Sequence, residues 1–243
     1  MSDLERQVRF LKRYAIGSSA VFLVLIGAAF RQAPGRVKLL EVERLNVLNP
    51  DGTLSLAIAG KGAMPGPMMD GKQFPPELSG GRTTSAGMIF FNESGDEVGG
   101  MTWAGLKTAD GYQAGEHLSF DHWKQDEVVT LDYSDDGKRH RAGLAITDRP
   151  RDFPLTELIP KLQAMRAATG ATRDSLQREM QGLASQGKFG AQRVFIGSDN
   201  ETAIVRLRDR QGKERIRMFV DTANVARLEF LDAQGSVIAK FPQ

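Results

Sequence analysis

An uninterrupted apolar run near the N-terminus is the first feature of the hydrophobic pattern. Residues 14–30 contain no charged side chain, and as a helix they would be about 25 Å long, slightly under the hydrocarbon core of a bilayer. Lys12, Arg13 and Arg31 flank the run and can extend to the head groups. The pattern predicts a transmembrane helix within an N-terminal segment 1–31, with these anchor residues: Tyr14, Val21, Phe22, Leu23, Val24, Leu25, Ile26 and Phe30.

Two other interpretations of this run stay open on sequence alone. A basic start, an apolar middle and the small residues at 27–29 also describe a cleaved signal peptide, and a buried core helix is the plainest alternative. Before the run, Leu4, Val8 and Leu11 recur at helical spacing. This short amphipathic stripe could pair with a sister chain as a coiled coil or lie on anionic lipid.

A recurring turn dominates the rest of the chain. Five four-residue segments begin with Asn, Asp or Ser and end with Gly, as a type I turn with a glycine bulge requires. Apolar and polar residues alternate in several of the arms that flank these turns, which is typical of half-buried strands. The sequence therefore predicts an antiparallel β-hairpin or meander body over 39–150 and 193–243. The five turns are 49–52, 92–95, 134–137, 209–212 and 232–235, and Asp110-Gly111 is a candidate sixth.

Two segments interrupt the hairpins. Residues 59–86 are rich in Gly and Pro and indicate a long loop, which could contact a partner or simply connect strands. In residues 153–187 the apolar residues recur at helical spacing. This spacing predicts a helical pair, with Thr172 as the N-cap of its second helix. The predicted fold class is mainly β with helical additions: a transmembrane helix, a hairpin body, and a helical insert before the C-terminal hairpins.

Composition narrows the function only by exclusion. The formal net charge is +2, and the excess comes from the residues before Tyr14, so the body is nearly neutral. A general nucleic-acid binder needs a clustered basic face, so no nucleic-acid partner is expected. The chain has no cysteine, which excludes disulfides, thiolate metal sites and cysteine nucleophiles.

Candidate chemistry is confined to residues 117–126. His117, Asp121 and His122 could ligate a divalent ion, although in a strand His117 and Asp121 point to one face and His122 to the other. Solvent-exposed polar residues explain the segment equally well. No catalytic or nucleotide-binding motif is present, and no cofactor is expected. The nearby aromatic residues are expected in the core, with a sugar-stacking surface as the alternative: Trp103, Tyr112, Phe120 and Trp123.

Several motifs together carry a resemblance. The chain has Leu-Glu-Arg-x-Val-Arg-x-Leu at 4–11, Glu-Arg-Leu-Asn-Val-x-x-Pro-Asp-Gly at 43–52 and Arg-Leu-Glu-Phe-Leu-Asp at 227–232. It resembles bacterial single-pass membrane proteins with short β-hairpin repeats, a group with no known activity. The resemblance implies a bacterial membrane location. We expect the inner membrane, and the segment's likeness to an uncleaved export signal favours an extracytoplasmic body.

These observations favour a non-enzymatic binding or scaffolding protein. Its expected partners are the lipid bilayer and further copies of itself, because hairpin arrays leave strand edges that must be paired or covered. Whether a protein or a glycan is its ligand is not determined by the sequence. The alternative is an exported hydrolase or metal-dependent enzyme that uses the segment from His117 to Asp126.

Overall fold

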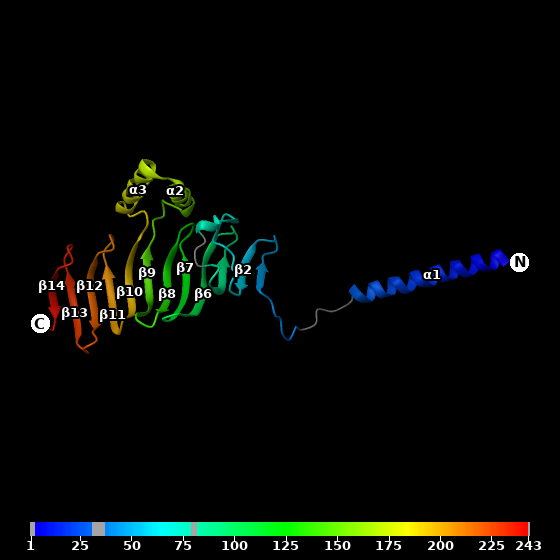
Figure 1. Ribbon diagram of the computed structural model, residues 1–243, viewed down its shortest axis with the longest axis horizontal. Helices are drawn as coiled ribbons and strands as arrows, with labels where there is room; N and C mark the ends of the chain where they lie inside the picture. The colour runs from blue at the N-terminus through cyan, green and yellow to red at the C-terminus, as the bar shows by residue number, and fades with distance from the viewer. Residues whose placement is uncertain (1–2, 31–36, 79–81, 243) are drawn as a thin grey trace. The chain divides into compact units, whose positions relative to one another are not determined.

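The computed structural model describes residues 3–30, 37–78 and 82–242, without the side chains of 28–30 (Figure 1). The basic residues Arg31 and Arg36 and part of the predicted loop, 79–81, lie outside the described residues. The chain divides into two compact units, residues 1–42 and 43–243.

The first unit contains one helix, α1 (Asp3–Phe30). It includes every predicted anchor residue. All its described side chains, the apolar ones included, are exposed. One stretch, Asp3–Gly27, is long and apolar enough to cross a membrane. The predicted helix is therefore confirmed, and an N-terminal signal sequence would have the same length and apolar character.

The second unit is built on one twelve-stranded antiparallel meander, in which each strand pairs with the strands of this sheet that come before and after it in the chain (Figure 1). Its order is β1-β2-β5-β6-β7-β8-β9-β10-β11-β12-β13-β14. The predicted fold class is confirmed. The strands are β1 (Arg44–Leu48), β2 (Leu54–Ala59), β5 (Ala86–Phe91), β6 (Glu97–Thr108), β7 (Gly111–Asp121), β8 (Glu127–Asp135), β9 (His140–Asp148), β10 (Ala191–Asp199), β11 (Thr202–Arg208), β12 (Glu214–Val220), β13 (Ala226–Leu231) and β14 (Val237–Phe241).

All five predicted turns join neighbouring strands, and the glycine at each fourth position has a positive φ between 73° and 89°. The first side chain often caps the turn: Asp232 accepts hydrogen bonds from the backbone N–H groups of Gln234 and Ser236 at 2.9 and 2.8 Å. The turn from Asp221 to Asn224 has the same bonds, but Asn224 (φ 59°) occupies the glycine position. The glycine signature therefore missed it.

The Gly/Pro-rich segment is more ordered than the predicted loop. It contains a small hairpin, β3 (Met68–Met69) and β4 (Lys72–Gln73), and a short 3-10 helix, η1 (Pro76–Leu78). Met64 from this segment is buried against β2 and β5. The segment thus packs against one face of β2 and β5. The buried core at this contact consists of Ala57, Ala59, Met64, Ile89 and Phe91.

A buried carboxylate ties this segment to two turns. Asp96 is 1% exposed and accepts hydrogen bonds from the backbone N–H of Asp70 at 2.7 Å and the Lys124 ammonium at 2.8 Å. Asn92 donates to its second oxygen at 3.1 Å. These contacts hold the pKa of Asp96 below its ordinary value, although burial alone would raise it. The folded structure therefore holds Asp96 as a charged carboxylate.

We expect Asp96→Asn to lower the free energy of unfolding by about 2 kcal/mol, because an amide leaves a buried donor facing Asn92 and weakens the bond from Lys124. Urea denaturation of the full-length chain in detergent measures this effect. Asp110→Asn, at the exposed turn between β6 and β7, is the control and should change stability by under about 0.5 kcal/mol. Equal effects of the two variants would contradict the anchoring role of Asp96.

The predicted helical pair is present as α2 (Leu155–Ala167) and α3 (Gly170–Ser185), inserted between β9 and β10. Figure 1 shows the pair at one end of the strands, near β8, β9 and β10. The predicted N-cap, Thr172, is wrong: Thr169 occupies that position, because its extended backbone (φ −131°) precedes the first helical residue. Pro160 lies inside α2.

Candidate functional site

A cleft of about 390 Å³ lies where α2 meets the Gly/Pro-rich segment and the end of β7. Apolar side chains from α2 and from β3, including Leu158, Leu162 and Met69, form part of its wall. Arg166 of α2 donates to the backbone carbonyl of Glu77, which attaches the helix to the segment opposite. The acidic residues that border the cleft are Glu97, Asp121, Asp126 and Glu127.

Two of these carboxyl groups are deprived of water. Burial raises the pKa of Asp121 to about 8, and the negative charges of Glu97, Glu127 and Asp126 add to the effect. Burial also raises the pKa of Glu97, against the lowering effect of Arg82, which donates a hydrogen bond to it. Buried atoms without a hydrogen-bond partner among the described residues are Arg82 Nη1, Glu97 Oε2 and Asp121 Oδ1.

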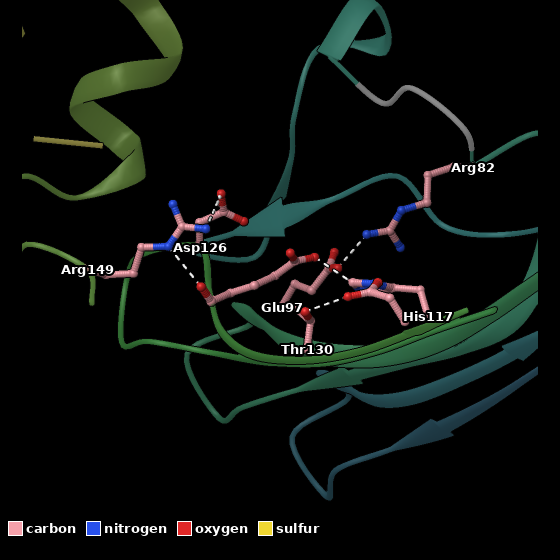
Figure 2. A network of polar contacts seen from close by, with 8 residues as sticks. Arg82, Glu97, His117, Asp126, Thr130 and Arg149 are labelled. Carbon is pink, nitrogen blue, oxygen red and sulfur yellow. Dashed lines mark hydrogen bonds and ion pairs between the residues drawn. The ribbon is translucent and has the colours of Figure 1, made fainter. Parts of the chain in front are cut away.

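His117 lies next to this cluster and is held between two carboxylates (Figure 2). Its Nδ1 is 2.6 Å from Asp132 Oδ1 and its Nε2 is 2.9 Å from Glu127 Oε1. These two hydrogen bonds raise the pKa of His117 to about 10, against the opposing effect of burial. Thr130 donates to the other oxygen of Asp132 at 2.6 Å. The charged His117 ring therefore forms ion pairs with Asp132 and Glu127, and both of its ring nitrogens are engaged.

The network continues toward α2 through Arg149 (Figure 2). Its guanidinium donates to the backbone carbonyl of Glu127 at 2.8 Å and pairs with Asp126 at 3.1 Å. Arg149 also donates to the carbonyl of Phe189 at 3.0 Å, so it connects the strands on both sides of the helical insert.

The structure brings only part of the candidate metal set together. His117 and Asp121 lie on the same face of β7, as the strand alternation predicted. His122 lies in the following turn, where its Nδ1 is 3.0 Å from the carbonyl of Trp123. Among the described residues, no three His, Asp or Glu side chains are grouped to hold a metal ion. Arg82, Glu97 and Asp132 escaped the sequence reasoning, because no motif links residues so far apart.

The second candidate surface is the other face of the sheet. Residues directly opposite each other on paired strands share a face, so the register defines rows that run across all the strands. One row takes an apolar residue from each strand in turn: Leu45, Ile58, Met88, Met101, Leu118, Leu131, Leu144, Ile196, Val205, Met218, Leu228 and Phe241.

A second row, two residues along each strand, lies on the same face and is also free of polar side chains. It consists of Val47, Leu56, Phe90, Gly99, Phe120, Val129, Ile146, Val194, Leu207, Ile216, Phe230 and Ala239. We call the two rows together the apolar stripe. Apart from Gly99, none of its residues is buried: Leu131 is 53% exposed, Met218 54% and Phe120 51%. The expectation that the aromatic residues Trp103, Tyr112, Phe120 and Trp123 lie in the core is wrong, because all four are exposed.

The stripe face is also hollowed near the C-terminus. A depression of about 630 Å³ lies over β10 to β13 and the end of β14, and its lining is almost entirely apolar. Stripe residues at this depression are Ile196, Val205, Met218, Leu228 and Phe241.

On the opposite face of β10 to β13, charged side chains form ion pairs with one another. Arg217 pairs with Glu229 at 2.6 Å, and Arg227 pairs with Asp221 at 2.8 Å. The guanidinium of Arg141 stacks 4.3 Å from the centroid of the Phe195 ring. The polar residues of β10 to β13 are therefore concentrated on the face away from the stripe.

Comparison of the chain with protein-family models, with curated proteins and with solved structures finds no match.

Proposed function

We propose that this chain is a non-enzymatic binding and scaffolding protein, anchored in the bacterial inner membrane by α1, that acts through its apolar stripe. The single observation that carries the proposal is the stripe itself. Soluble monomers rarely expose a continuous apolar patch larger than a few hundred Å², and larger patches mark sites of association. The ion pairs on the opposite face of β10 to β13, such as Arg217 with Glu229 and Arg227 with Asp221, favour exposure of that part of the face to water.

The membrane anchor rests on α1. Its apolar part follows Lys12 and Arg13, whose side chains can reach the head groups while Tyr14 suits the interface. We place the N-terminus in the cytoplasm and the body outside it. Carbonate washing of bacterial membranes should leave the full-length chain in the pellet. Release of the intact chain, or a mature N-terminus near Phe30, would contradict the anchor.

Charge on the stripe should abolish association. The double variant Leu131→Asp/Met218→Asp puts two carboxylates into the apolar rows, and burying them unpaired would cost more than the contact gains. After mild-detergent extraction of bacterial membranes, we expect the wild-type chain to sediment as a complex. The double variant should sediment as a single chain in its detergent micelle.

The matched control is Ile238→Asp, because Ile238 is 66% exposed and alternates with the stripe residues Ala239 and Phe241 on β14, so it lies on the opposite face. This variant should sediment with the wild type. Unchanged sedimentation of the double variant, with circular dichroism showing a folded sheet, would contradict the proposed role of the stripe.

A hydrolytic or metal-dependent enzyme that uses the segment from His117 to Asp126 is the alternative. It is favoured by the raised pKa of Asp121 beside a cleft, which suits a general acid. The two carboxylates at His117 weigh against it, because they leave no ring nitrogen for a metal or a proton acceptor. Stoichiometric bound metal in the purified chain, lost in His117→Ala and His122→Ala, would favour the enzyme.

A further inference from the structure

We infer that the occupant of the apolar stripe is the stripe of a second copy of this chain, with the two sheets packed face to face about a two-fold axis. The inference rests on the proposed function, since it names the partner at the surface proposed there. Face-to-face sheets pack about 10 Å apart and bury the side chains of both inner faces.

The area of the stripe agrees with what a stable pair needs. Twelve strands at a spacing of about 4.8 Å extend over about 50 Å, and two rows occupy about 13 Å along the strands. The stripe therefore covers about 700 Å². A standard protein–protein interface buries about 800 Å² on each partner, so the stripe alone supplies most of that area. Flanking apolar residues on the same face, such as Trp103 and Val220, extend it.

The chemistry of the stripe favours a copy of itself over a lipid surface. Surfaces that lie on bilayers combine an apolar face with neighbouring Lys and Arg for the head groups. Here Arg206, Arg217 and Arg227 lie on the opposite face and are paired with carboxylates. A surface without charge in either row is complementary to another such surface, which its own copy provides.

The strand order gives the pair a defined arrangement. A two-fold axis parallel to the strands, placed between β8 and β9, sets the C-terminal half of one sheet against the N-terminal half of the other. The depression over β10 to β14 then faces the part of the partner that carries protruding aromatic rings. Phe120 is 51% exposed and Trp103 is 41% exposed, and both lie on the stripe face. These rings would fill the depression.

Cysteine cross-linking tests this arrangement directly, because the natural chain contains no cysteine. Leu131→Cys places one thiol on the stripe beside the proposed axis, and Thr130→Cys places one on the opposite face of the same strand. With a short bismaleimide and purified full-length protein in detergent, we expect most of the Leu131→Cys chains to be cross-linked as pairs. The Thr130→Cys chains should stay single, and so should Ile238→Cys, which reports on the edge strand β14.

Light scattering of the same wild-type sample should give a protein mass of twice 26.6 kDa, and the Leu131→Asp/Met218→Asp variant should give half the wild-type value. Because that variant could fail to fold, the cross-linking variants, which keep the wild-type charge, stand as the independent measurement. A mass of one or of three chains, or cross-linking through Ile238→Cys in place of Leu131→Cys, would overturn the face-to-face pair.

The two proposals can fail separately. If purified chains are single while membrane extracts contain a larger complex that the double aspartate variant disrupts, the stripe binds a different protein. The self-pairing is then wrong and the proposed function stands. If neither the membrane complex nor the purified assembly responds to the variant, both proposals are wrong.

Discussion

Asp121→Asn should stabilise the body by about 3 to 5 kcal/mol at pH 9 and leave its stability nearly unchanged at pH 4. The reason is the environment of this carboxyl group at the end of β7. Burial and the neighbouring carboxylates Glu97 and Glu127 raise its pKa to about 8, and its buried Oδ1 has no hydrogen-bond partner among the described residues. Ionising it in the folded state is therefore costly, and an amide cannot ionise.

The sign follows from proton binding. Between about pH 4 and pH 8 the folded chain keeps a proton on Asp121 that the unfolded chain has lost. The free energy of unfolding of the wild type therefore falls as the pH rises through this window. His117 acts in the same direction at higher pH, because its pKa is raised from 6.5 to about 10. Its contribution is complete below about pH 6.5 and is lost by about pH 10.

The measurement is a series of urea denaturations of the full-length chain in detergent, at fixed protein concentration, from pH 4 to pH 10. Fluorescence of Trp103 and Trp123 reports unfolding. The difference between Asp121→Asn and wild type isolates Asp121, since both chains retain His117. Asp51→Asn is the control with the opposite sign, because Thr53 lowers the pKa of the exposed Asp51 carboxyl. Parallel profiles for Asp121→Asn and wild type would show that Asp121 ionises freely.

Phe195→Ala should lower the free energy of unfolding by about 3 to 5 kcal/mol, the range found for large-to-small changes at buried aromatic positions. Phe195 is 2% exposed on the charged face of β10 and packs with Ala145 and Ile204. Its ring also covers Gly143 on the neighbouring strand, where a Cβ would lie 2.6 Å from the ring. The loss would open a cavity and remove the surface on which Arg141 stacks.

The same urea series at pH 7 measures this loss. Ile238→Ala removes apolar atoms from an exposed position on the same face and should cost under about 1 kcal/mol. A small effect of Phe195→Ala would mean that this part of the sheet is stabilised by its ion pairs and by the opposite face, not by the Phe195 cluster.

The hairpin architecture could be predicted because its signals are local. A capping Asn or Asp and a glycine with positive φ lie within four residues, and the alternation of the arms lies within ten. The turn at Asn224 escaped because asparagine also tolerates a positive φ. Thr172 was wrongly assigned as a cap because the helix begins at Gly170, a residue of poor helix propensity.

The apolar stripe could not be predicted to the same depth, because it depends on the register between strands. Many apolar residues of the stripe lie in arms whose alternation predicted strands, but only the pairing across the sheet shows that they form two continuous rows. The cleft shows the same limit. Arg82 lies within the Gly/Pro-rich segment and Glu97 begins β6, and no local motif in the sequence links these two residues as an ion pair.

A meander connects each strand only to its neighbours in the chain, so a hairpin can be inserted or deleted without rethreading any other part. Each inserted or deleted hairpin would lengthen or shorten the apolar stripe by two strands and would preserve both of its rows. Gene duplication within the hairpin region would thus change the apolar area in equal steps, and with it the area that the proposed face-to-face pairing would bury.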